Sequence, residues 1–113
     1  MKKKQKTGVI NFKIDLDSNN IPEKINWEAT DSGNEKNDTK AVMISIWDAS
    51  QKSSLKIDLW TKEMKTDEMK RFYIDCLGGL SQSILSSTGD EYMSKETNKL
   101  CDKLIEHIKN NSN

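Results

Sequence analysis

The amino-acid sequence predicts an α+β fold, in which four antiparallel strands form one sheet and two C-terminal helices cover one face of it, in ββββαα order. Apolar and polar residues alternate over four segments between residues 10 and 60, and this period of two is typical of strands with one face in a core. From Met69 onward the apolar residues recur every three or four positions, as in an amphipathic helix. The length of 113 residues fits a single domain, 1–113.

The first predicted hairpin spans residues 10–29. Its first strand ends at the turn-forming residues 17–20. Its second strand begins after Pro22, because proline is tolerated at the start of a strand and not in its middle, and it alternates from Ile25 onward. The polar segment 31–39 follows no period, and we expect it to be a mobile surface loop.

The central hairpin contains the two most apolar strands, and its register decides which side chains reach solvent. We predict the register that gives one fully aliphatic face and leaves a loop of ordinary hairpin length at residues 49–52. The paired residues are then Ile46 with Leu55, Ile44 with Ile57, and Val42 with Leu59. A slip by one residue would turn Met43 and Trp47 inward and would expose the three β-branched side chains of the first strand.

The opposite face of this hairpin carries the candidate interaction surface. Its members are Met43, Trp47, Lys56, Asp58 and Trp60. A tryptophan offers about 150–250 Å², so the apolar members together approach the few hundred Å² at which an exposed patch indicates binding. The patch is smaller than the roughly 800 Å² per partner of a standard interface, which suits an anchor within a larger contact. The other interpretation is that the segment 31–39 or the N-terminal tail covers it, and the two interpretations have about equal weight.

The first helix is expected to have Thr66 as its N-cap and to end near Gly89. Its buried face is predicted to comprise Met69, Phe72, Tyr73, Cys76, Leu77, Leu80 and Ile84. Gly78 and Gly79 interrupt the helix, each at a cost of about 1 kcal/mol relative to alanine. We expect the close approach of another backbone as compensation, with a kink or break as the alternative.

The second helix is expected to start at Asp90 or Ser94, either of which is a suitable N-cap. Its buried stripe is predicted to comprise Thr97, Leu100, Cys101, Leu104, Ile105 and Ile108. Cys76 and Cys101 form no C-x-x-C pair, so we expect two buried thiols that pack as small apolar side chains in a reducing compartment. His107 lies in the last turn, where an imidazolium complements the helix dipole.

Charge and composition exclude several function classes. The 18 basic and 18 acidic residues cancel, so the chain lacks the positive field of nucleic-acid-binding proteins, and we expect no nucleic-acid partner. The lysines at positions 2, 3, 4 and 6 are not followed by the apolar region of a secretory signal, and they indicate a flexible basic tail over residues 1–7. No apolar run approaches the roughly 20 residues that span a bilayer, so we expect no integral membrane segment. The prediction is a soluble cytoplasmic protein whose C-terminal end, 110–113, is frayed.

Motifs that carry chemistry are absent from the sequence. A single histidine and two separated cysteines provide no metal-binding spacing. The sequence contains no glycine-rich phosphate loop of the form G-x-x-x-x-G-K-[ST] or G-x-G-x-x-G, and its serines have no G-x-S-x-G context. Paired carboxylates such as Asp67 and Glu68 stand at helix starts, where they complement the helix dipole. We therefore predict no catalytic residues, no cofactor and no metal, and a protein that is not an enzyme.

Five short segments carry a family resemblance. They are Ile21-Pro-Glu-Lys-Ile-Asn-Trp27, Trp47-Asp48, Ile57-Asp-Leu-Trp-Thr-Lys62, Asp67-Glu-Met-Lys70 and Gly89-Asp-Glu91. In their order and spacing, over almost the whole chain, they resemble the family of the gliding motility protein GldC. The resemblance implies a small soluble cytoplasmic accessory protein of bacterial gliding motility, without assigned catalytic residues. The segment 31–39 and the pair Gly78-Gly79 match no family pattern.

These observations lead to two functional hypotheses. The favoured one is a non-catalytic accessory protein that uses the outer sheet face, as a single chain or as a homodimer, to bind a protein component of the gliding machinery. The alternative is a small-ligand-binding domain or an enzyme with a pocket between the sheet and the helices.

Overall fold

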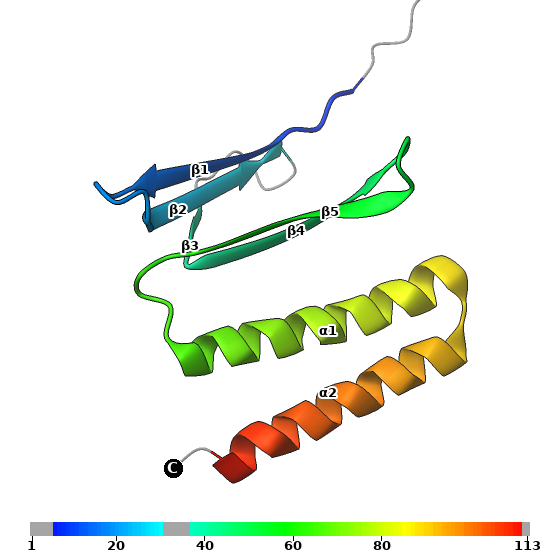
Figure 1. Ribbon diagram of the computed structural model, residues 1–113. Helices are drawn as coiled ribbons and strands as arrows, with labels where there is room; N and C mark the ends of the chain where they lie inside the picture. Colours follow the sequence, from blue (N-terminus) through cyan, green and yellow to red (C-terminus); the bar gives the residue numbers. More distant parts are fainter. Residues whose placement is uncertain (1–5, 31–36, 112–113) are drawn as a thin grey trace, which may run out of the picture. The chain divides into compact units, whose positions relative to one another are not determined.

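The computed structural model describes residues 6–30 and 37–111. The chain divides into two compact units, Met1–Met64 and Lys65–Asn113. The strands that the structure describes all lie in the first unit, and its two long helices lie in the second (Figure 1). The predicted α+β class, with antiparallel strands followed by two C-terminal helices, is confirmed. The packing of the helices on one face of a sheet and the single domain over 1–113 stay predictions.

The strands form two antiparallel sheets, and the expectation of a single four-stranded sheet was wrong. β1 (Ile10–Leu16), β2 (Pro22–Ala29) and β3 (Asn37–Thr39) form one sheet in the order β1-β2-β3. β4 (Ala41–Asp48) pairs with β5 (Ser53–Trp60) in the second sheet. The chain bends at Lys40, so the residues before it pair with β2 and the residues after it pair with β5. A change of strand partner at this bend divides what we expected to be one sheet.

Residues 37–39 form β3, which corrects the expectation of a loop over the whole of 31–39; residues 31–36 lie outside the described part. β3 pairs with residues 25–27 of β2, and the Asn26 side-chain amide donates a hydrogen bond to the Asp38 carboxylate across the two strands. This strand is held by backbone pairing and a polar cross-strand contact. Such a strand needs no apolar face, and Asn37–Thr39 lacks the apolar alternation by which strands are usually predicted.

The β1–β2 hairpin turns where the sequence predicts. The Asp17 carboxylate accepts hydrogen bonds from the backbone N–H groups of Asn19, at 2.8 Å, and Ile21, at 2.9 Å. This turn allows β2 to begin at Pro22 itself, opposite Leu16, and not after it as we expected. Ile25, in the middle of β2, has no exposed surface and lies in the core of the first unit.

The helical unit is an antiparallel hairpin of α1 (Thr66–Thr88) and α2 (Glu91–Asn111) (Figure 1). Gly89 ends α1 in the left-handed conformation, with φ of 73°, and its N–H donates to the Leu85 carbonyl, as predicted for a C-cap. Asp90 caps α2, because its carboxylate accepts from the Met93 N–H at 2.9 Å. Ser94 therefore lies inside the helix and is not its cap.

The start of α1 differs from the prediction. Thr66 is the first helical residue, and Lys65 occupies the N-cap position without a side-chain hydrogen bond to the helix. The Lys65 carbonyl accepts the Met69 N–H at 2.9 Å, which places the first helical turn one residue earlier than expected. Asp67 and Glu68 lie in the first turn, where their charges complement the helix dipole.

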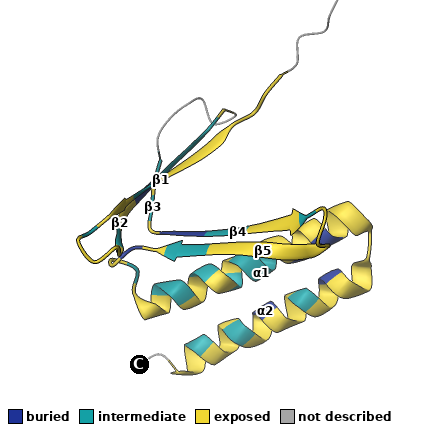
Figure 2. Cartoon of the chain, turned by 45° about the horizontal axis from the view of Figure 1, so that its top comes forward, coloured by how far each residue is buried: buried dark blue, intermediate teal, exposed yellow. Residues whose placement is uncertain are grey.

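Two serines form the closest described contact between the helices. Ser81 of α1 and Ser94 of α2 are both buried. The Ser81 hydroxyl donates to the Ser94 carbonyl at 2.9 Å, and the Ser94 hydroxyl donates to the Ser81 carbonyl at 3.0 Å. Farther along, the buried Cys101 places its Sγ 4.0 Å from the Ile74 carbonyl oxygen. Small side chains thus make these contacts between the two helices. Figure 2 shows that buried positions are few on both helices and that most of their surface is exposed.

The predicted buried stripes of the helices are confirmed only in part. Ile84 and Cys101 are buried, and Met69, Phe72, Cys76, Leu77, Thr97, Leu104 and Ile108 are half-buried. Four predicted members are exposed: Tyr73, Leu80, Leu100 and Ile105. The contact between α1 and α2 uses a narrower row of residues that includes the serines, which an apolar pattern does not reveal. Neither Cys76 nor Cys101 takes part in a disulfide.

The glycine pair in α1 does not mark a close approach or a break. The helix continues through Gly78 and Gly79. No heavy atom of a neighbouring part of the described chain lies within 4 Å of the position that a Cβ would take at either residue. The expectation that another backbone compensates the two glycines was therefore wrong.

Candidate interaction surface

The register of the β4–β5 hairpin determines which side chains share a face. The predicted register is confirmed, because Ile46 lies opposite Leu55, Ile44 opposite Ile57, and Val42 opposite Leu59. Opposite residues of an antiparallel pair point to the same face, and neighbours along a strand point to opposite faces. One face is therefore aliphatic. The other face carries the five predicted residues of the candidate interaction surface: Met43, Trp47, Lys56, Asp58 and Trp60.

Both tryptophans of the candidate interaction surface are exposed. Trp47 is 66% exposed and Trp60 is 49% exposed. Lys56 is also exposed, and its Nζ lies 3.1 Å from Asp58 Oδ2 on the same strand. An exposed ion pair of this kind contributes at most about 1 kcal/mol to stability. The pair therefore gives this face a defined charge pattern more than it stabilises the hairpin.

The two tryptophans lie at opposite ends of the hairpin. Trp47 pairs with Ser54 near the loop, whereas Trp60 pairs with Ala41 at the other end. Six residues separate these two rows, and at about 3.3 Å per residue the rows are about 20 Å apart. The predicted residues share a face, but within one chain the two indoles do not form a continuous patch. Lys56 and Asp58 lie between them.

The turn beside Trp47 is organised by a carboxylate. Asp48 accepts hydrogen bonds from the Gln51 N–H at 2.7 Å and from the Ser50 hydroxyl at 2.8 Å. These hydrogen bonds lower the pKa of Asp48, so it stays ionised at neutral pH. The loop 49–52 is thus held by its own side chains. The exposed Trp47 is presented next to a structured turn.

The Trp60 end borders an open hollow of about 360 Å³ within the first unit, formed by residues 20–22 and 58–62 together with Met64. Asp58 Oδ1 faces no hydrogen-bond partner in the described part of the chain although it is buried. The hollow is at the small end of the roughly 300–1,000 Å³ that is usual for ligand pockets. Its lining combines apolar side chains, among them Ile21, Leu59 and Trp60, with the polar Asn20 and Asp58.

Lys62 connects the end of β5 to the β1–β2 turn. The Lys62 ammonium group lies 2.6 Å from the Asp17 carboxylate and 3.4 Å from Glu23 Oε1. The backbone N–H of Lys62 donates to the Pro22 carbonyl at 3.3 Å. The hydrogen bond from Lys62, with the backbone N–H of Ile21, lowers the pKa of Asp17. The same contact raises the pKa of Lys62. This network holds the β1–β2 turn against the end of β5.

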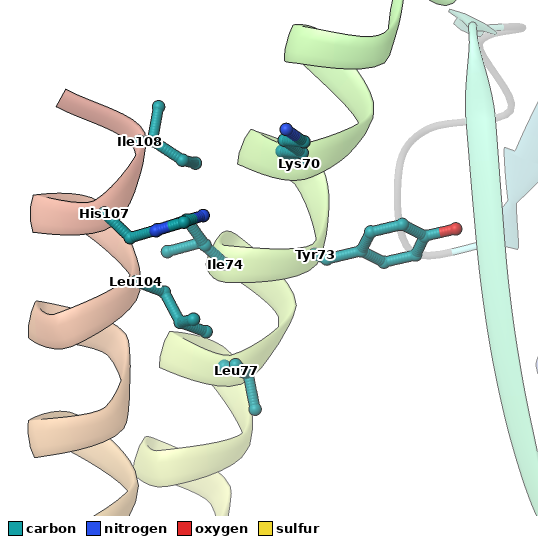
Figure 3. Close-up of a pocket in the computed structure, with 7 residues that line it drawn as sticks. All are labelled: Lys70, Tyr73, Ile74, Leu77, Leu104, His107 and Ile108. Atoms are coloured by element: carbon teal, nitrogen blue, oxygen red, sulfur yellow. The ribbon is translucent and has the colours of Figure 1, made fainter. Parts of the chain in front are cut away.

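A second hollow, which the sequence did not reveal, lies between α1 and α2 (Figure 3). It has a volume of about 240 Å³, and Ile74, Leu77, Leu104 and Ile108 form its apolar wall. His107 borders it, and its Nδ1 lies 3.1 Å from the Asn111 side-chain amide. The spacing of three and four residues between these apolar side chains was the available signal. The hollow is smaller than an ordinary ligand pocket. The predicted pocket between the sheet and the helices stays a prediction.

Two properties of the described residues bear on the class of protein. Neither α1 nor α2 has the combination of length and apolar character that a membrane-spanning helix requires. Within the same part of the chain, no three side chains of the metal-ligating types His, Cys, Asp and Glu are grouped so that they could hold a metal ion.

The fold and the hairpin surface define a small α+β protein made of a β-sheet unit and a helical hairpin. The model of the gliding motility-associated protein GldC-like family matches residues 22–110, and the chain belongs to this family. The match begins at the first residue of β2 and extends nearly to the end of α2. The resemblance inferred from the sequence segments is thereby confirmed. No curated protein and no solved structure matches the chain.

Proposed function

We propose that this protein is a non-catalytic accessory component of bacterial gliding motility, which binds another protein of the gliding machinery through the face of the β4–β5 hairpin that carries Trp47. Membership of the GldC-like family supports the process. The observation that carries the mode of action is the exposure of Trp47, which is 66% exposed beside a structured turn.

Trp47 has the properties of an interface anchor. Tryptophan is enriched among the few residues that dominate binding energy, each of which contributes about 2 kcal/mol or more. Because the neighbouring loop is held by Asp48, little conformational entropy is lost when the indole is covered. Lys56 and Asp58 then lie beside the anchor as charged groups that set orientation and partner choice.

The cytoplasm is the proposed site of action. Neither cysteine takes part in a disulfide, and a protein of a reducing compartment keeps its thiols reduced. Cys101 is buried and packs as a small apolar side chain in the helical unit. Fractionation of the producing bacterium, with detection of the chain in the soluble cytoplasmic fraction, tests this localisation, and recovery from the periplasm would contradict it.

A matched pair of aromatic substitutions tests the binding role. Trp47→Ala removes the exposed indole of the hairpin, whereas Tyr92→Ala removes an equally accessible ring, 74% exposed, from α2. In the bacterium that produces this protein, we expect Trp47→Ala to reduce colony spreading and Tyr92→Ala to leave it unchanged, at equal protein levels. A photo-crosslinking amino acid at position 47 should capture the partner, and the same group at position 92 should not.

The affinity for the captured partner gives the quantitative test. Trp47→Ala should weaken binding by about 30-fold or more, which corresponds to the roughly 2 kcal/mol of a hot-spot residue. Circular dichroism of both variants controls for folding. Wild-type spreading together with wild-type affinity in Trp47→Ala would remove this face from the proposed function.

A further inference from the structure

The outer edge of β5 is unpaired in the described chain. β5 has β4 as its neighbour on one side, and the two strands form a sheet of their own. Backbone hydrogen bonds beyond this ladder begin only after the strand, at Thr61 and Lys62. A two-stranded hairpin is at best marginally stable alone, and an unpaired edge is a template for pairing with a further strand.

The direction of the free backbone groups follows from the ladder. The Thr61 N–H donates to the Lys40 carbonyl at 2.8 Å, and hydrogen-bonded and non-hydrogen-bonded pairs alternate along an antiparallel ladder. Residue 57 therefore belongs to a pair that bonds toward β4. The N–H and C=O groups of the neighbouring residues, Lys56 and Asp58, face the open edge.

The sequence of β5 is complementary to itself when it is read in the antiparallel direction. The segment Leu55-Lys-Ile-Asp-Leu59 can be paired with a second copy about a two-fold axis at Ile57. Each Lys56 then lies opposite the Asp58 of the second copy, and each Leu55 lies opposite a Leu59. Opposite charges in directly facing positions favour pairing, and like charges in those positions oppose it.

We infer that two copies of this chain associate through the outer edges of β5, antiparallel and centred on Ile57, so that their two hairpins form one four-stranded sheet. The groups available for hydrogen bonding match this register, because the outward-facing groups of Lys56 in one copy lie opposite those of Asp58 in the other. A lysine in the middle of an edge strand normally opposes pairing. Here the Asp58 carboxylate of the second copy lies opposite Lys56 and provides it with a partner of opposite charge.

The alternative edge, that of β4, offers no such complementarity. Within Ala41–Asp48 the charged side chain is Asp48, at the end of the strand, where it is bonded within the loop. Two copies paired through β4 would place no opposite charges face to face. The inference concerns the edge of the sheet and goes beyond the proposed function, which concerns its face.

Charge reversal tests the inference with the full chain. Light scattering from about 1 μM to about 1 mM covers weak and moderate affinities, and the mass of the wild type should rise toward twice the 12.9 kDa of one chain. Because both copies of a homodimer carry the substitution, Lys56→Asp or Asp58→Lys places like charges opposite each other at two positions of the interface. Each variant alone should therefore dimerise at least about tenfold more weakly. A wild-type mass that stays at one chain overturns the inference.

Mixing the two variants separates association from folding. In the mixture, the two lysines of the Asp58→Lys chain face the two aspartates of the Lys56→Asp chain, so a heterodimer should form with an affinity near that of the wild type. The ion pair within each chain is absent in both variants and cannot be restored by mixing. Unimpaired homodimers of the single variants, or a mixture that does not associate, would overturn the proposed register.

Disulfide trapping locates the two-fold axis. At the axis, Ile57→Cys places two thiols in a non-hydrogen-bonded pair with Cα atoms about 4.5 Å apart, within the roughly 4.4–6.8 Å of disulfides. The control Leu55→Cys leaves the two thiols about four residues apart, about 13 Å. Under mild oxidation Ile57→Cys should form a covalent dimer, whereas Leu55→Cys and the wild type should not. Equal yields for Ile57→Cys and Leu55→Cys would contradict the register.

Discussion

Replacing Ile25 with alanine should destabilise the β-sheet unit strongly. Ile25 is 0% exposed and lies in β2 opposite Ile14 of β1 and Thr39 of β3. The substitution removes three carbon atoms from a closed site, and at about 0.8 kcal/mol for each buried methylene this amounts to about 2.4 kcal/mol. The cavity that remains raises the expected loss into the range of about 2–5 kcal/mol.

Ile10→Ala is the matched control, because it removes the same three carbon atoms from β1 of the same sheet. Ile10 is 65% exposed, so only about a third of the transfer free energy is at stake, or about 0.8 kcal/mol. The free energy of unfolding should therefore fall at least about three times as far in Ile25→Ala as in Ile10→Ala. For a domain with about 5–15 kcal/mol of stability, this difference is readily measured.

Urea denaturation followed by tryptophan fluorescence measures the unfolding of the β-sheet unit in both variants. The three tryptophans, Trp27, Trp47 and Trp60, all lie in strands of the first unit. With a slope of about 1.5 kcal/mol per molar urea, the midpoint should fall by about 1.6 M or more in Ile25→Ala and by about 0.5 M in Ile10→Ala. Equal shifts in the two variants would refute the assignment of the core to Ile25.

Two further predictions concern backbone conformation and charge. Alanine at Gly78 or Gly79 should raise stability by about 0.5–1 kcal/mol, because both glycines lie in a helix with open space around them. Alanine at Gly89, with φ of 73°, should lower stability by about 1 kcal/mol. Thermal melting compares the three variants, and a loss of stability at Gly78 would contradict the open surroundings. The pKa of Asp17 is lowered chiefly by Lys62, so its contribution is present at neutral pH and is lost as the pH falls below about 4. Asp17→Asn should therefore lose less stability than the wild type between about pH 7 and about pH 3, and parallel urea midpoints would count against this ion pair.

The sequence was sufficient for the hairpins and not for the division into two sheets. The register of β4 and β5 could be predicted because the aliphatic period and the loop length allow one good pairing. β3 could not, because Asn37–Thr39 is wholly polar and is held by backbone pairing to β2. The bend at Lys40 follows from that pairing, since the chain changes partner there. A strand without apolar alternation gives no signal in a single sequence.

The helical unit shows a second limit of pattern reading. The prediction ranked apolar residues, whereas the buried contact between the helices is made by Ser81 and Ser94. Serine is usually found at caps and turns, where its hydroxyl bonds the backbone. Here each hydroxyl bonds the backbone of the other helix, which satisfies the polar atoms and permits close contact. The same side chain in the sequence therefore supports either interpretation, and Ser94 was one of the two N-cap candidates for α2, beside Asp90.

The separation of the two tryptophans links the proposed face and the inferred edge. In the β5-to-β5 register centred on Ile57, Ser54 of one copy lies opposite Trp60 of the second, and Ser54 is already paired with Trp47 in its own hairpin. One row across the joined sheet then runs from Trp47 through Ser54 to the second copy's Trp60, all on one face. Two strand spacings of about 4.8 Å bring these indoles to about 10 Å from each other, half their separation within one chain. Two copies would thereby assemble two aromatic patches from side chains that a single chain keeps apart. Trp60→Ala should then weaken partner binding as Trp47→Ala does, and the wild-type chain should bind the partner less well when it is diluted below the concentration at which it dimerises.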